Sequence, residues 1–128
     1  MILLNKNLIE TIPRETDFLI LNTGFYKHRQ TERFWKNNPG VSPDMAELLK
    51  LRCPGLKVLG MDTISLTSYQ NRVHGRESHR KFLGDNEILL VEDMNLKNVV
   101  TQLVKLMCFP ILINDVDGCP VTIIAEYE

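Results

Sequence analysis

Two side chains in the second half of the chain could together hold a divalent metal ion: the His79 imidazole and the Glu92 carboxylate. Both groups are good ligands for zinc or manganese. They are 13 positions apart, so they do not share a helix face. We expect His79 near the start of a helix and Glu92 at the end of a strand, with their side chains converging. Spacing alone favours the alternative of a capping or surface histidine and a solvated glutamate.

A second group of polar residues, Asp62, Thr63 and Ser65, follows an apolar stretch that predicts a strand. The carboxyl ends of strands face the ligand crevice in α/β folds, so these residues are pocket candidates. An ordinary turn leaving the strand would use the same residue types. His28, in a loop after Thr23-Gly24, is a further candidate for a base or ligand, or else an exposed polar residue.

Other chemistries find little support in the sequence. His74 and His79 are five positions apart, whereas the helical zinc motif with two histidines needs four. Cys119 has no histidine near it in sequence that could activate a thiolate nucleophile. The chain contains no glycine-rich phosphate loop, since Gly60 and Gly84 stand alone.

Alternating strands and helices must position these residues. Apolar runs predict strands at 17–22, 57–62 and 88–92, each buried on both faces. Short helices are expected at 31–36 and 77–82, with an irregular loop over 63–76. Ser42 as N-cap and Pro43 at the first helical position predict a helix that ends before Cys53.

The C-terminal part predicts a β-hairpin. Strands are expected at 109–113 and 121–125, joined by a tight turn at Asp117-Gly118, whereas the pattern over 96–106 fits either helix or loop. The fold class is therefore α/β with a C-terminal antiparallel hairpin, arranged as one domain over residues 1–128. One central sheet should bury Phe18, Ile20, Val58, Leu59, Leu89, Val91, Ile111, Leu112, Ile123 and Ile124.

Composition narrows the class of protein. Apolar residues make up 44% and charged residues 24% of the 128, which is typical of a globular domain and excludes a disordered or fibrous chain. A net charge of -1 argues against a nucleic-acid partner. No apolar run approaches the length of a membrane span, and the N-terminus lacks the pattern of a secretory signal. Three sparse cysteines predict mostly buried, reduced thiols in a cytoplasmic protein.

Six short segments, in order, give the chain a resemblance to a known family. They are FLILNTG (18–24), NPGVS (38–42), VLGMDTIS (58–65), HRKFLG (79–84), ILLVEDMNL (88–96) and DGCPV (117–121). Together they resemble the cyclase family of metal-dependent hydrolases, of which bacterial kynurenine formamidase is the best-known member.

The resemblance implies a fold, an activity and a site. The fold would be a swivelling β/β/α domain. The activity would be hydrolysis of amide or ester-like bonds in a small-molecule substrate, with zinc or manganese as the divalent metal. His79 and Glu92 match the family's ligand positions.

The chain departs from the family in two respects. In that family, a histidine-rich motif supplies most of the metal ligands and the catalytic histidine. This chain lacks the motif, so it corresponds to the C-terminal portion of a family member. The stretch from His79 to Glu92 is one residue longer than expected, with the extra residue within 84–87. Since a catalytic zinc needs about three protein ligands, we expect a chain that is not catalytically self-sufficient and a site that is empty or weakly occupied.

Three functions remain open at this stage. The first is a C-terminal portion of a metal-dependent hydrolase whose missing ligands come from another chain or from a longer protein. The second is a non-catalytic remnant that oligomerises or binds a ligand. The third is an unrelated small α/β binding module. In the first two, an uncovered apolar sheet face predicts a homo-oligomer with the segment 1–12 packed against a partner.

Overall fold

The computed structural model describes residues 4–99 and 103–127. The chain divides into two compact units, Met1–Lys97 and Asn98–Glu128, which are described separately below. The first unit contains a three-stranded sheet with its helices, and the second contains a two-stranded sheet.

The sheet of the first unit is parallel and has the order β1-β2-β3. Its strands are β1 (Phe18–Leu21), β2 (Val58–Met61) and β3 (Leu89–Val91). Leu19 pairs with Leu59, and Leu59 pairs with Leu90, so the register runs directly across the sheet. All three strands lie inside the ranges predicted from the apolar runs. The α/β class expected from the sequence is confirmed.

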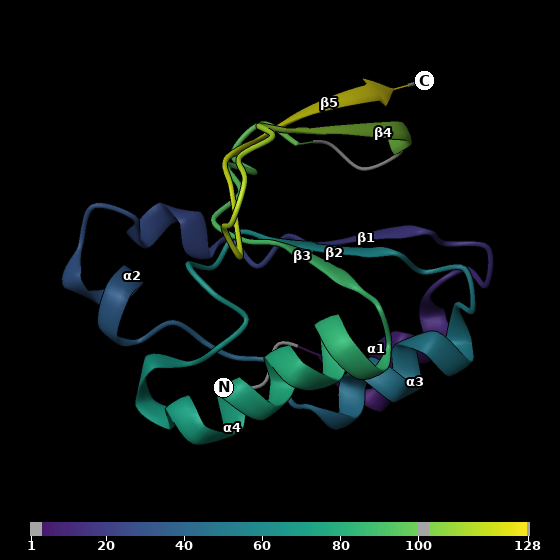
Figure 1. Cartoon of the computed structure of the whole chain (residues 1–128), viewed down its shortest axis with the longest axis horizontal. Helices are drawn as coiled ribbons and strands as arrows, with labels where there is room; N and C mark the ends of the chain where they lie inside the picture. Colours follow the sequence, from purple (N-terminus) through teal and green to yellow (C-terminus); the bar gives the residue numbers. More distant parts are fainter. Residues whose placement is uncertain (1–3, 100–102, 128) are drawn as a thin grey trace. The chain divides into compact units, whose positions relative to one another are not determined.

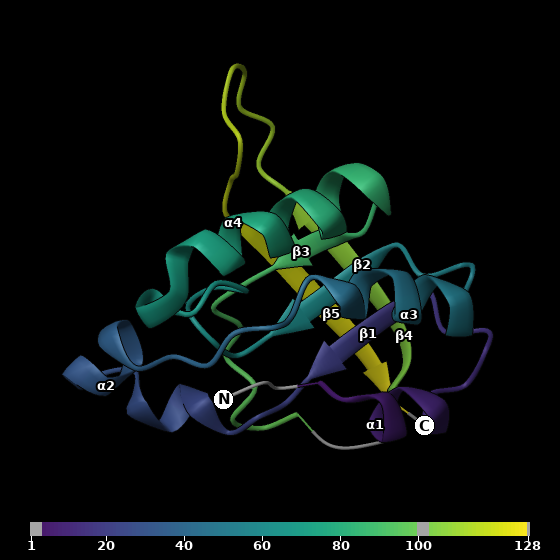
Figure 2. The ribbon, with the colours of Figure 1, turned by 90° about the horizontal axis from the view of Figure 1, so that it is seen from below.

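The main helices of the first unit lie on one side of this sheet (Figure 1). They are α1 (Lys6–Thr11), α3 (Asp44–Arg52) and α4 (Arg72–His79). A fourth helix, α2 (Glu32–Lys36), lies beyond the carboxyl ends of the strands (Figure 2). Shorter turns complete the unit: two 3₁₀ turns, η1 (Phe25–His28) and η2 (Tyr69–Asn71), and the π-helical turn η3 (Arg80–Asp85), which continues α4.

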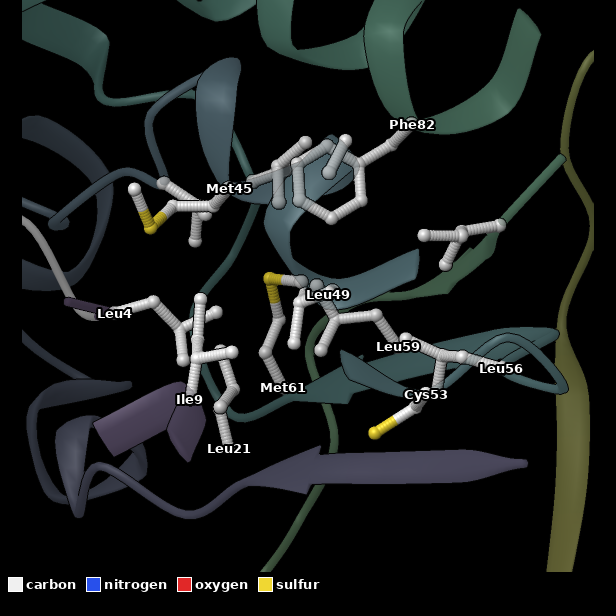
Figure 3. Packing of buried hydrophobic residues seen from close by; sticks show 14 of the residues in the cluster. Leu4, Ile9, Leu21, Met45, Leu49, Cys53, Leu56, Leu59, Met61 and Phe82 are labelled. Carbon is white, nitrogen blue, oxygen red and sulfur yellow. The ribbon is translucent and has the colours of Figure 1, made fainter. Parts of the chain in front are cut away.

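The hydrophobic core lies between the sheet and these helices (Figure 3). Side chains alternate across a strand, so every second strand residue points to this layer. Leu21, Leu59 and Met61 come from the strands and are buried. The helical and loop residues that pack against them are Leu4, Ile9, Ile12, Val41, Met45, Ala46, Leu49, Cys53, Leu56, Leu66, Phe82 and Ile88.

The predicted core was wrong in its extent. Of the ten residues expected to be buried, only Leu59 is buried in the structure, whereas Leu89 and Leu112 are exposed. The apolar runs had indicated strands covered on both faces, but the helices of the first unit cover only one (Figure 1). Phe18, Ile20, Val58 and Val91 are only half-buried, and Ile111, Ile123 and Ile124 belong to the other sheet or its loop.

The second unit is an antiparallel hairpin of β4 (Leu103–Pro110) and β5 (Val121–Tyr127). A hairpin was predicted, but β4 begins earlier than expected. The ten-residue connection is not a tight turn at Asp117-Gly118. Its turn lies at Asn114-Asp115, where Asp115 adopts a φ of 59°, a left-handed conformation that aspartate tolerates.

Two helix starts differ from the predictions. α4 begins at Arg72, inside the range expected to be a loop, because the Asn71 side chain accepts a hydrogen bond from the His74 N–H and caps the helix. At α3, Ser42 does not cap through its side chain; its backbone carbonyl accepts from the Met45 N–H instead. The end of α3 before Cys53 is confirmed.

The described part of the N-terminal segment packs on its own unit, and its contact with a partner stays a prediction. Leu4, Ile9 and Ile12 are buried in the core, and the Ile12 carbonyl accepts a hydrogen bond from Arg52 Nε at 2.6 Å. The expectation for residues 1–3 lies outside the described residues. Because α1 supplies core side chains, this segment is an integral part of the first unit.

The cysteines were predicted to be mostly buried, and this holds only for Cys53. Its burial raises the pKa of the thiol, so Cys53 is a poor nucleophile. Cys108 is exposed and Cys119 is half-buried. Within the described ranges, no helix has both the length and the apolar character required to cross a bilayer.

The described core predicts how two leucine substitutions in α3 affect stability, one at a buried position and one at an exposed control position. Leu49 is completely buried, whereas Leu51, two residues along the same helix, is 76% exposed. Leu49→Ala should lower the free energy of unfolding by about 2–5 kcal/mol, because it removes buried methyl groups and leaves a cavity. Leu51→Ala should change it by less than about 0.5 kcal/mol. Urea unfolding followed by circular dichroism measures both, and equal losses would contradict the described core.

Candidate metal and ligand site

Glu92, which directly follows β3, joins three parts of the first unit through one carboxylate oxygen. Its Oε1 accepts hydrogen bonds from the Leu66 N–H at 2.7 Å and the Ser65 hydroxyl at 3.1 Å. The same oxygen lies 3.3 Å from Nε2 of His79, at the end of α4. The side chains of His79 and Glu92 therefore converge, as the family resemblance implied, but His79 lies at the end of a helix and not near its start as expected. Both are about two-thirds buried.

The other ring nitrogen of His79 is held by backbone and side chain. Nδ1 lies 3.0 Å from the Gly75 carbonyl oxygen and 2.9 Å from the Thr67 hydroxyl. A carbonyl oxygen only accepts hydrogen bonds, so a hydrogen bond to Gly75 places a proton on Nδ1, and the lone pair of a neutral ring is then on Nε2. In the other neutral tautomer, Nδ1 accepts from the Thr67 hydroxyl and Nε2 donates to Glu92.

Gly75 allows α4 to approach the loop that carries Thr67. A Cβ atom at position 75 would collide with the Thr67 side chain, and a threonine is too short to swing away. Without that close approach, Thr67 would not reach His79. Glycine at this helical position therefore helps to fix the orientation of the histidine ring.

The two groups shift each other's pKa in the directions expected of an ion pair. The hydrogen bond to Glu92 raises the pKa of His79, and the Gly75 carbonyl adds to this, while burial lowers it. For Glu92, burial works to raise the pKa, but the hydrogen bonds from His79, Leu66 and Ser65 outweigh it and hold the pKa below its usual value. The imidazolium form satisfies both the carboxylate and the Gly75 carbonyl.

His79 and Glu92 fit two of the ligand positions of a metal site. Metal-binding histidines usually donate their second N–H to a carbonyl or carboxylate, and His79 is held in that manner by Gly75. A metal would take the place of the Nε2 proton beside Glu92. In residues 4–99 and 103–127, however, no three His, Cys, Asp or Glu side chains gather closely enough to hold a metal. One imidazole and one carboxylate fall short of the three protein ligands of a catalytic zinc.

Asp62 and Thr63, two of the pocket candidates, are completely buried. Asp62 Oδ1 accepts hydrogen bonds from the Thr23 N–H and hydroxyl at 3.0 and 2.6 Å, and Oδ2 accepts from the Tyr26 N–H at 3.2 Å. These bonds tie the end of β2 to the segment after β1. Thr63 donates to the Ser65 carbonyl. The Asp62 side chain therefore holds the ends of β1 and β2 together, the Thr63 side chain bonds within the loop after β2, and both are buried away from any ligand.

An open groove of about 320 Å³ lies beside the His79–Glu92 pair. Of the four pocket candidates, only Ser65 lines it. Sequence reasoning had not selected the residues of its other walls, which come from two stretches of the chain, 35–38 and 64–76. They are Trp35, Asn38, Ile64, Thr67, Tyr69, Arg72 and Arg76.

His28, the remaining candidate, lies outside this groove. It sits in η1, half-buried, with its ring edge against Phe25 at a centroid distance of 5.2 Å. Its backbone carbonyl accepts a hydrogen bond from the Thr31 hydroxyl. In the described structure, His28 is part of the packing around α2.

The comparison with known families identifies the chain's family. Residues 5–68, half of the chain, match the family model described as putative cyclase. The chain belongs to this family. The matched range contains Asp62, Thr63 and Ser65 and ends before His79 and Glu92, so the family match does not itself cover the metal-ligand pair.

Individual relatives agree with this assignment. An uncharacterized protein of Methanocaldococcus jannaschii is 29% identical over 111 residues, which is 85% of this chain and 53% of that protein. Cyclase-like protein 2 of Arabidopsis thaliana is 32% identical and Cyclase-like protein 3 of Oryza sativa subsp. japonica is 28% identical, each over 66 residues. Those matches cover 52% of this chain and 23% of each plant protein. The chain thus spans about half or less of these relatives, and no solved structure matches it.

The ion pair makes stability depend on pH in a defined window. His79, with its raised pKa, stabilises the fold fully below its ordinary value of 6.5, and this contribution is lost as pH rises through the raised pKa. Glu92, with its lowered pKa, contributes fully above 4.5, and its contribution is lost as pH falls through the lowered pKa. The pair should therefore stabilise most between about pH 4.5 and 6.5.

Unfolding in urea at pH 5.5 and pH 9 tests this window. His79→Gln should cost on the order of 1 kcal/mol at pH 5.5 and less at pH 9. The matched control is His74→Gln, which removes an exposed histidine of the same helix outside the pair. A loss for His79→Gln that is equal at both pH values, or larger at pH 9, would show that the pair does not act as described.

Proposed function

We propose that this chain supplies two ligands, His79 and Glu92, to the divalent-metal centre of a hydrolase that cleaves amide or cyclic-amide bonds. The remaining ligands would come from another chain or from another segment of a longer protein. One observation carries the proposal: Nε2 of His79 lies 3.3 Å from Oε1 of Glu92, while the Gly75 carbonyl and the Thr67 hydroxyl hold the ring through Nδ1. Membership of the cyclase family supports the hydrolase class.

The chain's own residues would prepare this half of the site. The Leu66 N–H and the Ser65 hydroxyl hold Glu92 in place, and Thr67 and Gly75 hold the ring of His79. A bound zinc or manganese ion would supply a water molecule with a pKa lowered to about 7. The groove beside the pair would seat the small-molecule substrate. The cytoplasm is the proposed location, because free thiols suit a reducing compartment.

The alternative function is that of a non-catalytic module that oligomerises, and the hairpin favours it. Residues directly opposite each other in β4 and β5 share a face, so Met107, Ile124 and Phe109 lie on one face and Leu106 and Ile123 on the other. A two-stranded hairpin alone is marginally stable in water, and the described residues of the second unit contain no helix to cover either face.

A second copy of this chain is the occupant we propose for the hairpin surface. Its nine large apolar side chains, which lie on both faces and in the connection, are 37–92% exposed. Together they present on the order of 800 Å², about what one partner contributes to a standard interface. The same surface on each copy allows a two-fold contact. The nine apolar side chains of the hairpin surface are those of Val104, Phe109, Ile111, Leu112, Ile113, Val116, Val121, Ile124 and Tyr127.

Metal titration tests the main proposal. Calorimetry with zinc and with manganese should show weak binding to the wild-type chain, because two ligands hold a metal poorly. Glu92→Ala should weaken it at least tenfold. Glu32→Ala, which removes an exposed carboxylate on α2, is the matched control and should leave it unchanged. Hydrolysis of N-formylkynurenine by the 128-residue chain should be undetectable.

Two outcomes would contradict this account. Metal binding that is equally strong in the wild type and in Glu92→Ala would remove Glu92 from the ligand set. Tight stoichiometric metal with turnover that Glu92→Ala abolishes would show that the chain is catalytically self-sufficient.

The association proposal predicts an oligomer that charges on the hairpin disrupt. The wild-type chain should sediment as a dimer or larger species at about 20 μM, a concentration at which standard interfaces are occupied. Phe109→Lys with Ile124→Lys should give a monomer, since lysine ammonium groups resist burial. Leu51→Lys, at a still more exposed apolar position on α3, is the control and should leave the association unchanged. A monomeric wild type would contradict the proposal.

A further inference from the structure

The groove beside the His79–Glu92 pair has an unbalanced positive charge. Arg72 is the first residue of α4, and Arg76 follows one turn later, so both guanidinium groups lie on one helix face along the groove wall. The amino end of a helix is itself positive, and α4 has no acidic residue in its first turn. Two arginines at this position repel each other and the helix dipole.

No protein carboxylate compensates this charge. Among residues 4–99 and 103–127, no carboxylate oxygen lies within 4.0 Å of a nitrogen of Arg72 or Arg76. By contrast, Arg29 and Arg80 each pair with an aspartate at 2.8 and 3.1 Å. The guanidinium groups of the groove are therefore available to an external anion, for which arginine provides a planar pair of donors.

Two aromatic side chains form another part of the groove wall. Trp35 is 55% exposed and Tyr69 is 49% exposed, so neither ring is buried in the core. The Arg72 guanidinium lies 4.5 Å from the centre of the Tyr69 ring, which is a cation–π contact. Half-exposed rings beside an open groove suit a flat, apolar ligand body.

We propose that this groove binds a planar aromatic carboxylate, with the carboxylate on Arg72 and Arg76 and the ring against Trp35 and Tyr69. A volume of about 320 Å³ accommodates a ligand with one or two rings. A phosphate ion would satisfy the arginines but leave both aromatic walls unused.

The groove also connects to the candidate metal site, and in this respect the inference rests on the proposed function. Ser65 and Thr67 line the groove, and they also contact Glu92 and His79. A ligand anchored by its carboxylate at Arg72 and Arg76 would place its other end toward this pair.

Trp35 provides a direct readout, because it is the sole tryptophan of the chain. The full chain, without added metal, is titrated with benzoate while the fluorescence of Trp35 is followed. Three further probes each lack one or both features of benzoate. Benzamide lacks the charge, acetate lacks the ring, and inorganic phosphate lacks both the ring and the carboxylate. Benzoate should bind at least tenfold more tightly than each of the three.

Arginine variants assign the carboxylate contact. Arg72→Gln with Arg76→Gln should weaken benzoate binding at least tenfold, because the charge-assisted donors are lost. Arg80→Gln, which removes the next arginine along this helical segment but lies outside the groove, is the matched control and should bind as the wild type does. Equal binding by the double variant, or binding of benzamide, acetate or phosphate as tight as that of benzoate, would overturn the inference.

The experiment separates this inference from the proposed function. Benzoate binding is measured without metal and without turnover, so it does not depend on His79 or Glu92 as ligands. Benzoate binding that requires the two arginines, together with zinc binding indifferent to Glu92→Ala, would leave the groove assignment standing and remove the metal site. The opposite pair of results would remove the groove assignment alone.

Discussion

The hydrogen bonds to Oε1 of Glu92 hold together the part of the molecule that could do chemistry. One oxygen atom receives donors from the loop after β2, through Ser65 and Leu66, and from His79 at the end of α4. These segments are separate in sequence and meet at this oxygen. A buried carboxylate left without these donors would lose several charge-assisted hydrogen bonds, so the loop, the strand end and the helix have to come together.

This constraint also defines what can occupy the space next to Glu92. When the Gly75 carbonyl holds a proton on Nδ1 of His79, the position facing Glu92 is taken either by the second ring proton or by a cation. The same geometry therefore serves as an ion pair that stabilises the fold and as two preformed ligands of a metal. Glycine at position 75 is part of the arrangement, because any side chain there would push α4 away from Thr67.

The sequence predicted the elements better than it predicted the packing. The runs around Phe18, Val58 and Leu89 indicated three strands correctly, because apolar runs of that length bounded by polar residues have few alternatives. Burial was overestimated, since periodicity does not reveal how many faces of a sheet are covered. The convergence of His79 and Glu92 followed from the family resemblance and the expected strand end. The groove at Trp35, Tyr69, Arg72 and Arg76 was missed because residues 63–76 were expected to form a loop, so no shared helix face was predicted for Arg72 and Arg76.

The central claim is that this chain binds a divalent metal through Nε2 of His79, the ring nitrogen that faces Glu92. Nitrogen-15 NMR of the histidine rings during a zinc titration tests it directly, since the chain has three histidines and each ring nitrogen gives its own signal. The account predicts that zinc shifts Nε2 of His79 and leaves its Nδ1 protonated, and that Glu92→Gln weakens this response. A response at His28 or His74 in place of His79, or one at Nδ1 of His79, would contradict it.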